Sequence, residues 1–211
     1  MNIIRRPFRY RYSNVVFILI GLNLLVHLAV HFFRDIPIIG LFAMNPILVL
    51  QHGWVWQFVT YMFIHDPRSL SHLLFNMFAL FIFGRQVEQQ MGSREFLLYY
   101  LLTGALAGFF SFLVYLFTGE VWVRLMGASG AIFAIQLAFA SLFPRAIIYI
   151  WGILPLKAPV MVLAFTGLGL FFMVTGRGGN VAHVTHLAGF AFGWLYFVVR
   201  FGINPWRAMR Q

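Results

Sequence analysis

The stretch VVFILIGLNLLVHLAVHFF, residues 15–33, decides the fold class of this chain. It contains no charged residue, and about 20 predominantly apolar residues are enough for a helix to cross the hydrocarbon core of a bilayer. Working outward from it, five further apolar runs of similar length follow at residues 69–87, 96–117, 126–143, 158–175 and 181–201. We therefore expect an all-α, polytopic membrane protein with six transmembrane helices.

The composition agrees with a lipid environment. Of the 211 residues, 62% are hydrophobic and only 9% are charged, whereas a soluble domain has about 25% charged residues. The formal net charge of +10 would suit a nucleic-acid-binding protein. The charges, however, fall between the apolar runs instead of gathering on one soluble surface, so we expect a lipid bilayer and no nucleic acid as partner. With no cysteine in the chain, thiol chemistry is excluded.

We expect residues 1–211 to form one membrane domain, with a short N-terminal segment at 1–14, a six-helix core at 15–201 and a short tail at 202–211. The first apolar run is too long for the core of a signal peptide and has no obvious small-residue cleavage site after it. It is therefore expected to remain in the protein as the first span.

The basic residues predict how the chain is oriented. If the N-terminus lies inside, eleven of the fifteen lysines and arginines also lie inside. The other four are Arg34, Arg68, Arg124 and Arg177. By the positive-inside rule, both termini are then cytoplasmic, as an even number of spans requires. We expect a multi-pass protein of a bacterial inner (plasma) membrane.

Polar side chains gather near the start of three of the runs. His72 lies near the start of the second, Ser129 of the fourth and His186 of the sixth. These three runs all pass from outside to inside, so the three side chains share one depth, on the order of 10 Å from an outer helix end. Polar groups are costly inside a membrane, and a common depth allows these three to form one site.

Small residues favour close approach of the helices that carry this site. Gly130, Ala134 and Ala138 form a stripe on the fourth run, and Gly189 and Gly193 form a G-x-x-x-G on the sixth. Small residues let membrane helices pack closely. Such packing would allow the contact of about 2.6–3.2 Å that a hydroxyl–imidazole hydrogen bond requires.

The chemistry that fits these groups is nucleophilic acyl transfer. Ser129 is the candidate nucleophile and His186 the candidate base, because a serine hydroxyl needs a neighbouring imidazole to take its proton. His72, the amide of Asn76 and the backbone N–H of Ser129 are candidate donors to an oxyanion. His72 and Asn76 are four residues apart and share one helix face.

A third catalytic carboxylate is not expected. No acidic residue lies near the outer end of the sixth run; the chain has only Asp35, Asp66, Glu88, Glu95 and Glu120. We therefore predict a Ser–His dyad rather than a triad.

These motifs resemble those of the rhomboid family of intramembrane serine proteases. The serine motif G-x-S-G is present at residues 127–130, and the oxyanion motif H-x-x-x-N runs from His72 to Asn76. The base motif H-x-x-G-x-x-x-G comprises His186, Gly189 and Gly193. Glu88 followed by Gly92-Ser93 matches a further family pattern. The resemblance covers residues 15–201, with the motifs in the family's order.

The resemblance implies a six-helix rhomboid-like bundle that hydrolyses a peptide bond in or near a transmembrane segment of its substrate proteins. It also implies that substrates pass the fifth helix and the loop before the sixth, and that no cofactor or metal is needed. Gly127, Gly130, Phe133, Gly189 and Gly193 are implied as supporting residues of the site.

The chain departs from the family at two positions. The Trp-Arg pair of the first loop appears as Trp56-Gln57, which removes an ionic donor. The aromatic residue one turn after the serine, often tyrosine, is Phe133, which can pack against His186 but has no hydroxyl. Neither departure removes a catalytic group.

Other interpretations of the same residues remain open. Taken alone, the glycines around Ser129 equally suit simple helix packing. His183 is an alternative base, although the glycines that follow His186 favour the latter. His27 and His31 share a face of the first helix and are expected near the outer interface.

Three rival functions fit less well. A transporter or channel would carry charged or broken helices at mid-depth, and few such features are present. A zinc enzyme built on His72, His183 and His186 would lack both the H-E-x-x-H motif and an acid placed as general base. An inactive rhomboid-like binding protein would typically have lost the serine or the histidine.

Overall fold

In the computed structural model, residues 6–33, 35–150, 152–175 and 180–210 are described. Arg5, Arg34 and Arg177, which contribute to the predicted orientation, and most of the loop before the sixth span lie outside these residues. The helices that carry the expected spans are α1 (Val15–Phe32), α5 (Leu70–Ala79), α6 (Arg85–Met91), α7 (Ser93–Thr118), α8 (Ser129–Leu142), α9 (Ala158–Thr175) and α10 (Asn180–Tyr196). Two π-helical segments, η3 (Leu80–Gly84) and η4 (Phe197–Phe201), continue α5 and α10.

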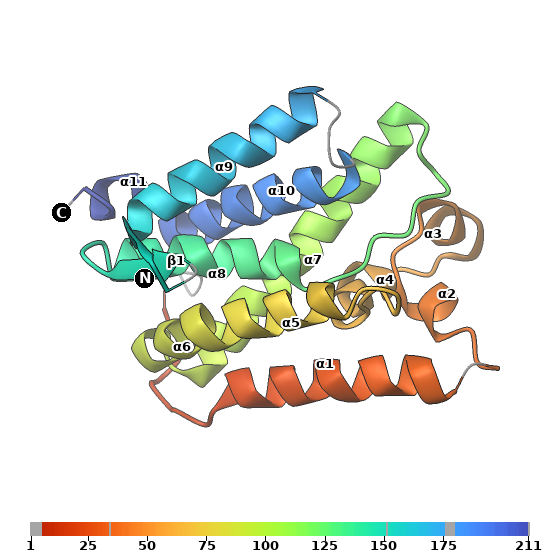
Figure 1. The fold of residues 1–211 in the computed structure, drawn as a ribbon, viewed down its shortest axis with the longest axis horizontal. Helices are drawn as coiled ribbons and strands as arrows, with labels where there is room; N and C mark the ends of the chain where they lie inside the picture. Colours follow the sequence, from red (N-terminus) through yellow and green to blue (C-terminus); the bar gives the residue numbers. More distant parts are fainter. Residues whose placement is uncertain (1–5, 34, 151, 176–179, 211) are drawn as a thin grey trace.

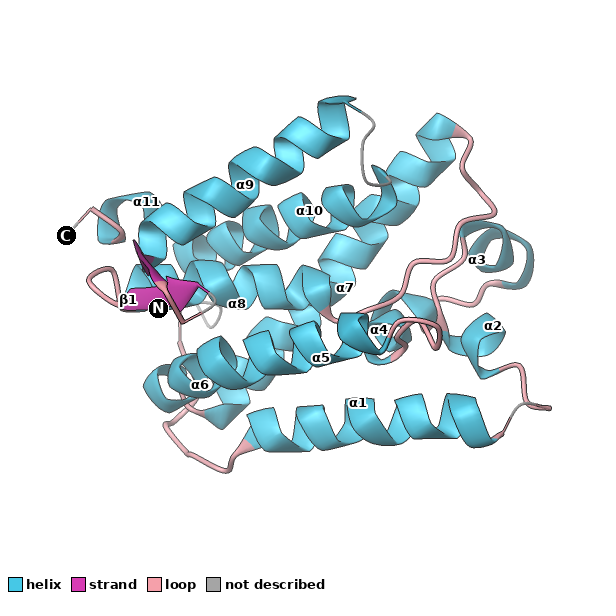
Figure 2. Cartoon of the chain, in the orientation of Figure 1, coloured by secondary structure: helices cyan, strands magenta, loops and turns pink. Residues whose placement is uncertain are grey.

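Shorter elements complete the chain. Between α1 and α5 lie α2 (Ile38–Phe42), α3 (Pro46–His52), α4 (Gln57–Thr60) and the 3₁₀ turn η2 (Tyr61–Phe63). A hairpin of β1 (Ile147–Ile150) and β2 (Leu154–Lys157) joins α8 to α9, and α11 (Pro205–Ala208) follows η4. Figure 2 shows the hairpin as the one magenta feature among the helices of the described chain.

The predicted fold class is confirmed. Within the described residues, four helices are long and apolar enough to cross a membrane: Val15–Phe32, Leu70–Met91, Ser93–Thr118 and His183–Phe201. Two shorter apolar helices, Ser129–Leu142 and Ala158–Leu168, stand where the fourth and fifth spans are expected. Together they form the polytopic helical bundle that the six apolar runs predict.

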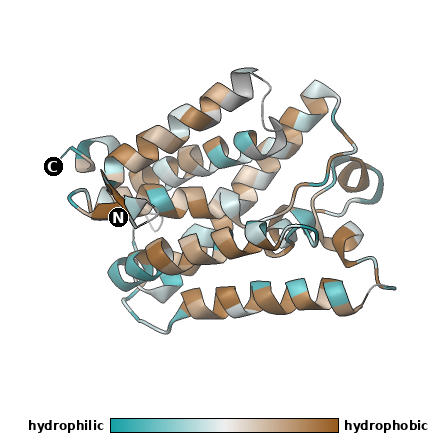
Figure 3. Ribbon diagram, viewed as in Figure 1, coloured by the Kyte–Doolittle hydropathy of each residue, from teal (hydrophilic) through white to brown (hydrophobic). Residues whose placement is uncertain are grey.

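Helix α8 lies inside the bundle, packed against α7, α9, α10 and η3 (Figure 1). Most of its residues are buried, including Ala131, Ala134 and Ala138. Large apolar side chains such as Phe78, Phe117 and Leu25 are instead exposed, and brown, hydrophobic stretches recur along the helices in Figure 3. Exposed apolar side chains are expected for a protein in a bilayer, because the lipid chains around it are as apolar as the protein core.

Two local features differ from the sequence prediction. The fourth helix begins at Ser129 rather than Met126, because a β-bridge between Met44 and Leu125 holds the preceding chain extended. The segment between the fourth and fifth apolar runs forms the β1–β2 hairpin. Its β-branched and aromatic residues favour strands, and Gly152 takes the positive φ of +72° at the turn.

Candidate active site

Ser129 is positioned by the tight turn that opens α8. Gly127 just before it has φ +111°, and its N–H donates to the carbonyl of Tyr61 at 3.0 Å. A Cβ at Gly127 would lie 2.8 Å from Nε2 of His72, so glycine is needed both for the backbone conformation and for the close approach of that imidazole. The turn therefore lets the His72 imidazole lie against the backbone that precedes Ser129.

His186 reaches Ser129 from α10. Its Nε2 lies 2.8 Å from Oγ of Ser129, within hydrogen-bonding distance. Phe133, one turn along α8, stacks on the His186 ring, with 4.1 Å between the centroids and 7° between the planes. Phe190 packs edge-on against Phe133, with 5.0 Å between the ring centroids. The imidazole is thus held in one plane by aromatic packing.

Close packing of α8 and α10 makes this contact possible. A Cβ at Gly189 would collide with the carbonyl oxygen of Gly130, and one at Gly193 would come within 3.1 Å of the Cα of Ala134. A hydrogen bond of 2.7 Å between the hydroxyls of Thr185 and Ser111 further ties α10 to α7. Any side chain at Gly189 would push the helix carrying His186 away from Ser129.

His72 and Asn76 lie on α5, whose first turn is capped by the Ser69 hydroxyl. The Asn76 amide donates to the carbonyl of His72 at 2.7 Å, which fixes the amide beside the site. His65 packs edge-on against His72 with 5.2 Å between ring centroids. Burial, followed by the proximity of His72, lowers the pKa of His65 to about 3, so His65 is neutral at physiological pH.

A cavity of about 1000 Å³ lies between α5 and α9, and α8 forms its floor. His72, Asn76, Ser129 and His186 all line it. The rest of its wall is largely apolar, with contributions from Phe75, Phe78, Ile132, Met161 and Phe165. The structure therefore brings the four predicted polar residues to one apolar cavity.

One lining residue was not identified from the sequence. Gln136 is buried to 6% exposure, and its Oε1 has no hydrogen-bond partner among the described residues. It lies seven residues after Ser129, two helical turns along the same face of α8. The seven-residue spacing from Ser129 could therefore have indicated a second polar side chain on the face of α8 that lines the cavity.

Two of the acidic residues are engaged with other parts of the protein. Glu88 accepts hydrogen bonds from the backbone N–H groups of Val15 and Val16, and Glu95 is held by Arg200 and Tyr196. Among the residues that the structure describes, no carboxylate hydrogen-bonds to His186. His183 approaches His186 only edge-on, with 6.2 Å between centroids.

Gln57, which stands in the first loop where the Trp-Arg pair of the family has an arginine, is held in place without an ionic contact. Gln57 is fully buried; its Oε1 accepts from the N–H of Asn45 at 3.0 Å, and its Nε2 donates to the carbonyl of Gly40 at 3.1 Å. Trp56 donates to the carbonyl of Leu41 at 3.0 Å. The neutral amide therefore orders the loop with hydrogen bonds alone.

Fold and cavity together define a multi-pass integral membrane protein with a polar cluster inside its helical bundle. A family model described as the Rhomboid domain matches residues 52–203. This chain belongs to the rhomboid family, which confirms the resemblance found in the motifs.

Individual relatives support the same assignment. Over 183 residues the chain is 27% identical to the rhomboid protease GlpG of Haemophilus influenzae, covering 86% of this chain and 90% of that protein. It is 29% identical over 150 residues to the putative rhomboid protease YdcA of Bacillus subtilis, covering 70% and 68%. It is 40% identical over 125 residues to rhomboid-like protein 11, chloroplastic, of Arabidopsis thaliana, covering 58% of this chain. The chain spans 40% and 49% of the lengths of two Arabidopsis relatives.

Proposed function

We propose that this chain is an intramembrane serine endopeptidase that cleaves a peptide bond in or near a transmembrane segment of its substrates. The observation that carries the proposal is the 2.8 Å separation of Ser129 Oγ and His186 Nε2 inside an apolar cavity. Membership of a family that includes proteins named rhomboid proteases supports the same reaction.

The proposed reaction proceeds through an acyl-enzyme. Ser129 Oγ attacks the carbonyl carbon of the scissile bond while His186 takes its proton. The tetrahedral oxyanion accepts hydrogen bonds from His72, Asn76 and the Ser129 N–H. His186 then gives the proton to the leaving amine, and a water molecule activated by the same imidazole hydrolyses the ester. Neither metal nor cofactor takes part, and Phe133 keeps the imidazole in plane.

We further propose that substrates enter the cavity laterally, between α5 and α9. The cavity is bounded there by apolar side chains of both helices, including Phe75, Phe78 and Phe165. An apolar passage would let a transmembrane segment reach Ser129 without crossing a polar surface.

The proposal includes a topology and a location. We propose that residues 1–211 form one membrane domain with both termini in the cytoplasm and the dyad near the outer face of a bacterial inner membrane. Because the chain has no cysteine, single cysteines at Arg9 and Phe117 give a direct test. A membrane-impermeant maleimide added outside intact cells should label Phe117→Cys and leave Arg9→Cys unlabelled; the opposite pattern would invert the topology.

The test of the activity is cleavage of a single-span reporter in proteoliposomes. Ser129→Ala should lower the rate by more than about 10³-fold, since loss of a serine nucleophile removes most of the rate enhancement in serine proteases. The variant should keep the wild-type melting temperature, because only one hydroxyl near a cavity is lost. Undiminished cleavage by pure Ser129→Ala protein would refute the nucleophile, and a wild-type protein inactive on many such reporters would favour a binding function.

A further inference from the structure

A second cavity lies between α7 and α10 and shares no lining residue with the cavity of the dyad. It has a volume of about 540 Å³. Its walls are Leu98, Leu102 and Leu106 on α7 and Phe192, Leu195 and Val199 on α10 and η4. From Leu98 to Leu106 it follows one face of α7 for about 12 Å. Leu102, Leu195 and Val199 are each more than 40% exposed, so this groove opens to the surroundings of the bundle.

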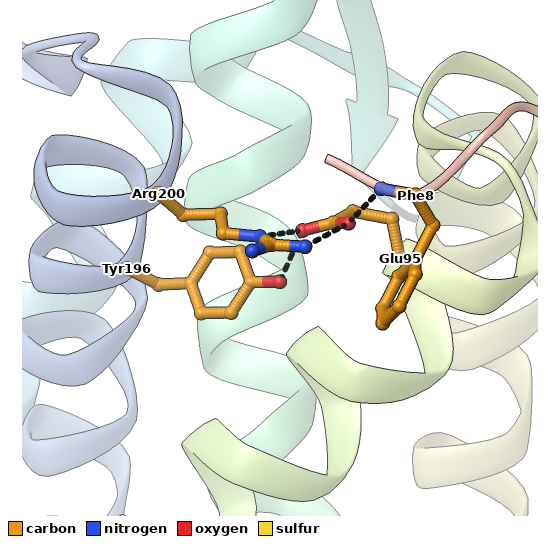
Figure 4. A network of polar contacts seen from close by, with 4 residues as sticks. All are labelled: Phe8, Glu95, Tyr196 and Arg200. Carbon is orange, nitrogen blue, oxygen red and sulfur yellow. Dashed lines mark hydrogen bonds and ion pairs between the residues drawn. The ribbon is translucent and has the colours of Figure 1, made fainter. Parts of the chain in front are cut away.

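Two arginines line the same groove, Arg6 and Arg200. Arg200 is fixed by Glu95, with Nε 2.8 Å from Oε1 and Nη2 3.0 Å from Oε2 (Figure 4). Tyr196 also donates to Glu95 Oε1, at 2.5 Å. The Arg200 guanidinium is therefore fixed at this end of the groove, because Glu95 holds it with two hydrogen bonds.

The N-terminal segment is fastened over this end of the groove. The N–H of Phe8 donates to Oε2 of Glu95 at 3.0 Å, and the Phe8 ring lies under the Arg200 guanidinium at 5.3 Å (Figure 4). Arg6, two residues earlier, reaches the groove as a second cation. Two arginines and one carboxylate leave this end with a net positive charge.

We propose that this groove is a binding site for an anionic phospholipid of the adjacent leaflet. One acyl chain lies along the leucines of α7 and the apolar residues of α10, and the phosphate meets Arg6 beside Arg200. Arginine pairs well with phosphate oxygens, and basic pockets between transmembrane helices bind anionic headgroups. An apolar channel with cations at one end is complementary to an amphiphile with one charged head.

A second copy of this chain fits the groove less well. Its cationic end would need a carboxylate from the partner, and the chain has only five acidic residues. Glu88 and Glu95 are already used inside the protein, by the start of α1 and by Arg200. Asp35, Asp66 and Glu120 belong to the loops α1–α2, η2–α5 and α7–α8, and Figure 1 shows these loops at the end of the bundle opposite the N-terminus. A parallel copy in the same membrane would therefore present no acid at this depth.

The test is native mass spectrometry of the full-length protein released from detergent, titrated with phosphatidylglycerol or phosphatidylcholine of identical acyl chains. One phosphatidylglycerol should bind at least about fivefold more tightly than phosphatidylcholine, since each arginine near the headgroup favours an anionic lipid. Arg6→Gln should reduce this preference to about twofold or less, and Arg6→Lys should keep most of it. Arg6 lies in the segment before α1, so these substitutions leave the bundle intact.

Two further variants distinguish binding at this groove from non-specific attraction of anionic lipid to a positively charged protein. Arg145→Gln removes the same charge from the turn after α8, outside the groove, and should leave the lipid preference unchanged. Leu102→Trp fills the groove and should weaken both lipids equally. Equal binding of the two lipids by the wild type, equal effects of Arg6→Gln and Arg145→Gln, or a dimer that Leu102→Trp dissociates would each overturn the proposal.

Discussion

The two ends of the bundle differ in whether their polar side chains face a cavity or are bonded to other groups of the protein. At the end that holds Ser129, the polar side chains are hydroxyl, amide and imidazole groups, and they face a large cavity that no carboxylate or guanidinium of the described residues lines. At the end that holds Glu95, the buried carboxylate is fully engaged: Glu95 accepts hydrogen bonds from the backbone N–H of Phe8, from Tyr196 and from Arg200, and it is 1% exposed. The polar groups around Ser129 therefore face the space that a substrate would occupy, whereas Glu95 is engaged inside the protein.

This difference separates stabilising polar groups from reactive ones. A buried charge is tolerated when it is paired and hydrogen-bonded, which describes Glu88 and Glu95. The proposed nucleophile needs one base and free space around it, and Ser129 has both His186 and the cavity beside it. Substitutions at the dyad end should therefore change the rate with little effect on stability, and substitutions at the other end should do the reverse.

The largest expected effect is at the base. His186→Ala should lower reporter cleavage by more than about 10³-fold with an unchanged KM, because the serine loses its proton acceptor. His183→Ala is the matched control, one turn away on α10, and should keep cleavage within about tenfold. Steady-state kinetics in proteoliposomes measure both. If His183→Ala were the inactive variant, the base would have to be reassigned.

A smaller loss is expected at the oxyanion donors. Asn76→Ala should reduce kcat by about 10²-fold, since one donor to the oxyanion is lost. Asn76 also bonds the His72 carbonyl, so the melting temperature must be measured with the rate. If Asn76 had only a structural role, Asn76→Ala would lower the melting temperature and would leave kcat unchanged at temperatures below melting.

At the opposite end the expected effect is on stability. Glu95→Gln leaves Arg200 without its ionic partner and should lower the free energy of unfolding by about 3 kcal/mol. Thermal unfolding in detergent and cleavage at a temperature well below melting are the two measurements. The comparison of the two ends would fail if this variant kept wild-type stability but lost activity.

The sequence predicted the helical frame well because hydrocarbon thickness sets both the length and the polarity of a span. The start of α8 was misplaced by three residues, because a tertiary bridge to Met44 holds the chain that precedes Ser129. The π-helical turns at Leu80–Gly84 and Phe197–Phe201 had no sequence signal, since they depend on packing rather than on local propensity.

The candidate site could be predicted because the order of the spans fixes the depth in the membrane at which each span's opening residues lie. Common depth selected Ser129, His186 and His72, and the four-residue spacing from His72 selected Asn76; all four line one cavity. The Ser111–Thr185 hydrogen bond between α7 and α10 could not be predicted, because neither residue belongs to a motif. Glu88 was noticed only as part of a family pattern; its two bonds to the first turn of α1 required coordinates.

The most direct test of the account is covalent labelling of the purified protein with a fluorophosphonate. An activated Ser129 should form a phosphonate ester with the probe, detected as a fluorescent band and as one modified peptide containing residue 129. Both Ser129→Ala and His186→Ala should abolish the band, because the reaction needs the hydroxyl and the base together. Labelling that survives in Ser129→Ala, or that does not depend on His186, would contradict the claim that these two side chains form a catalytic dyad.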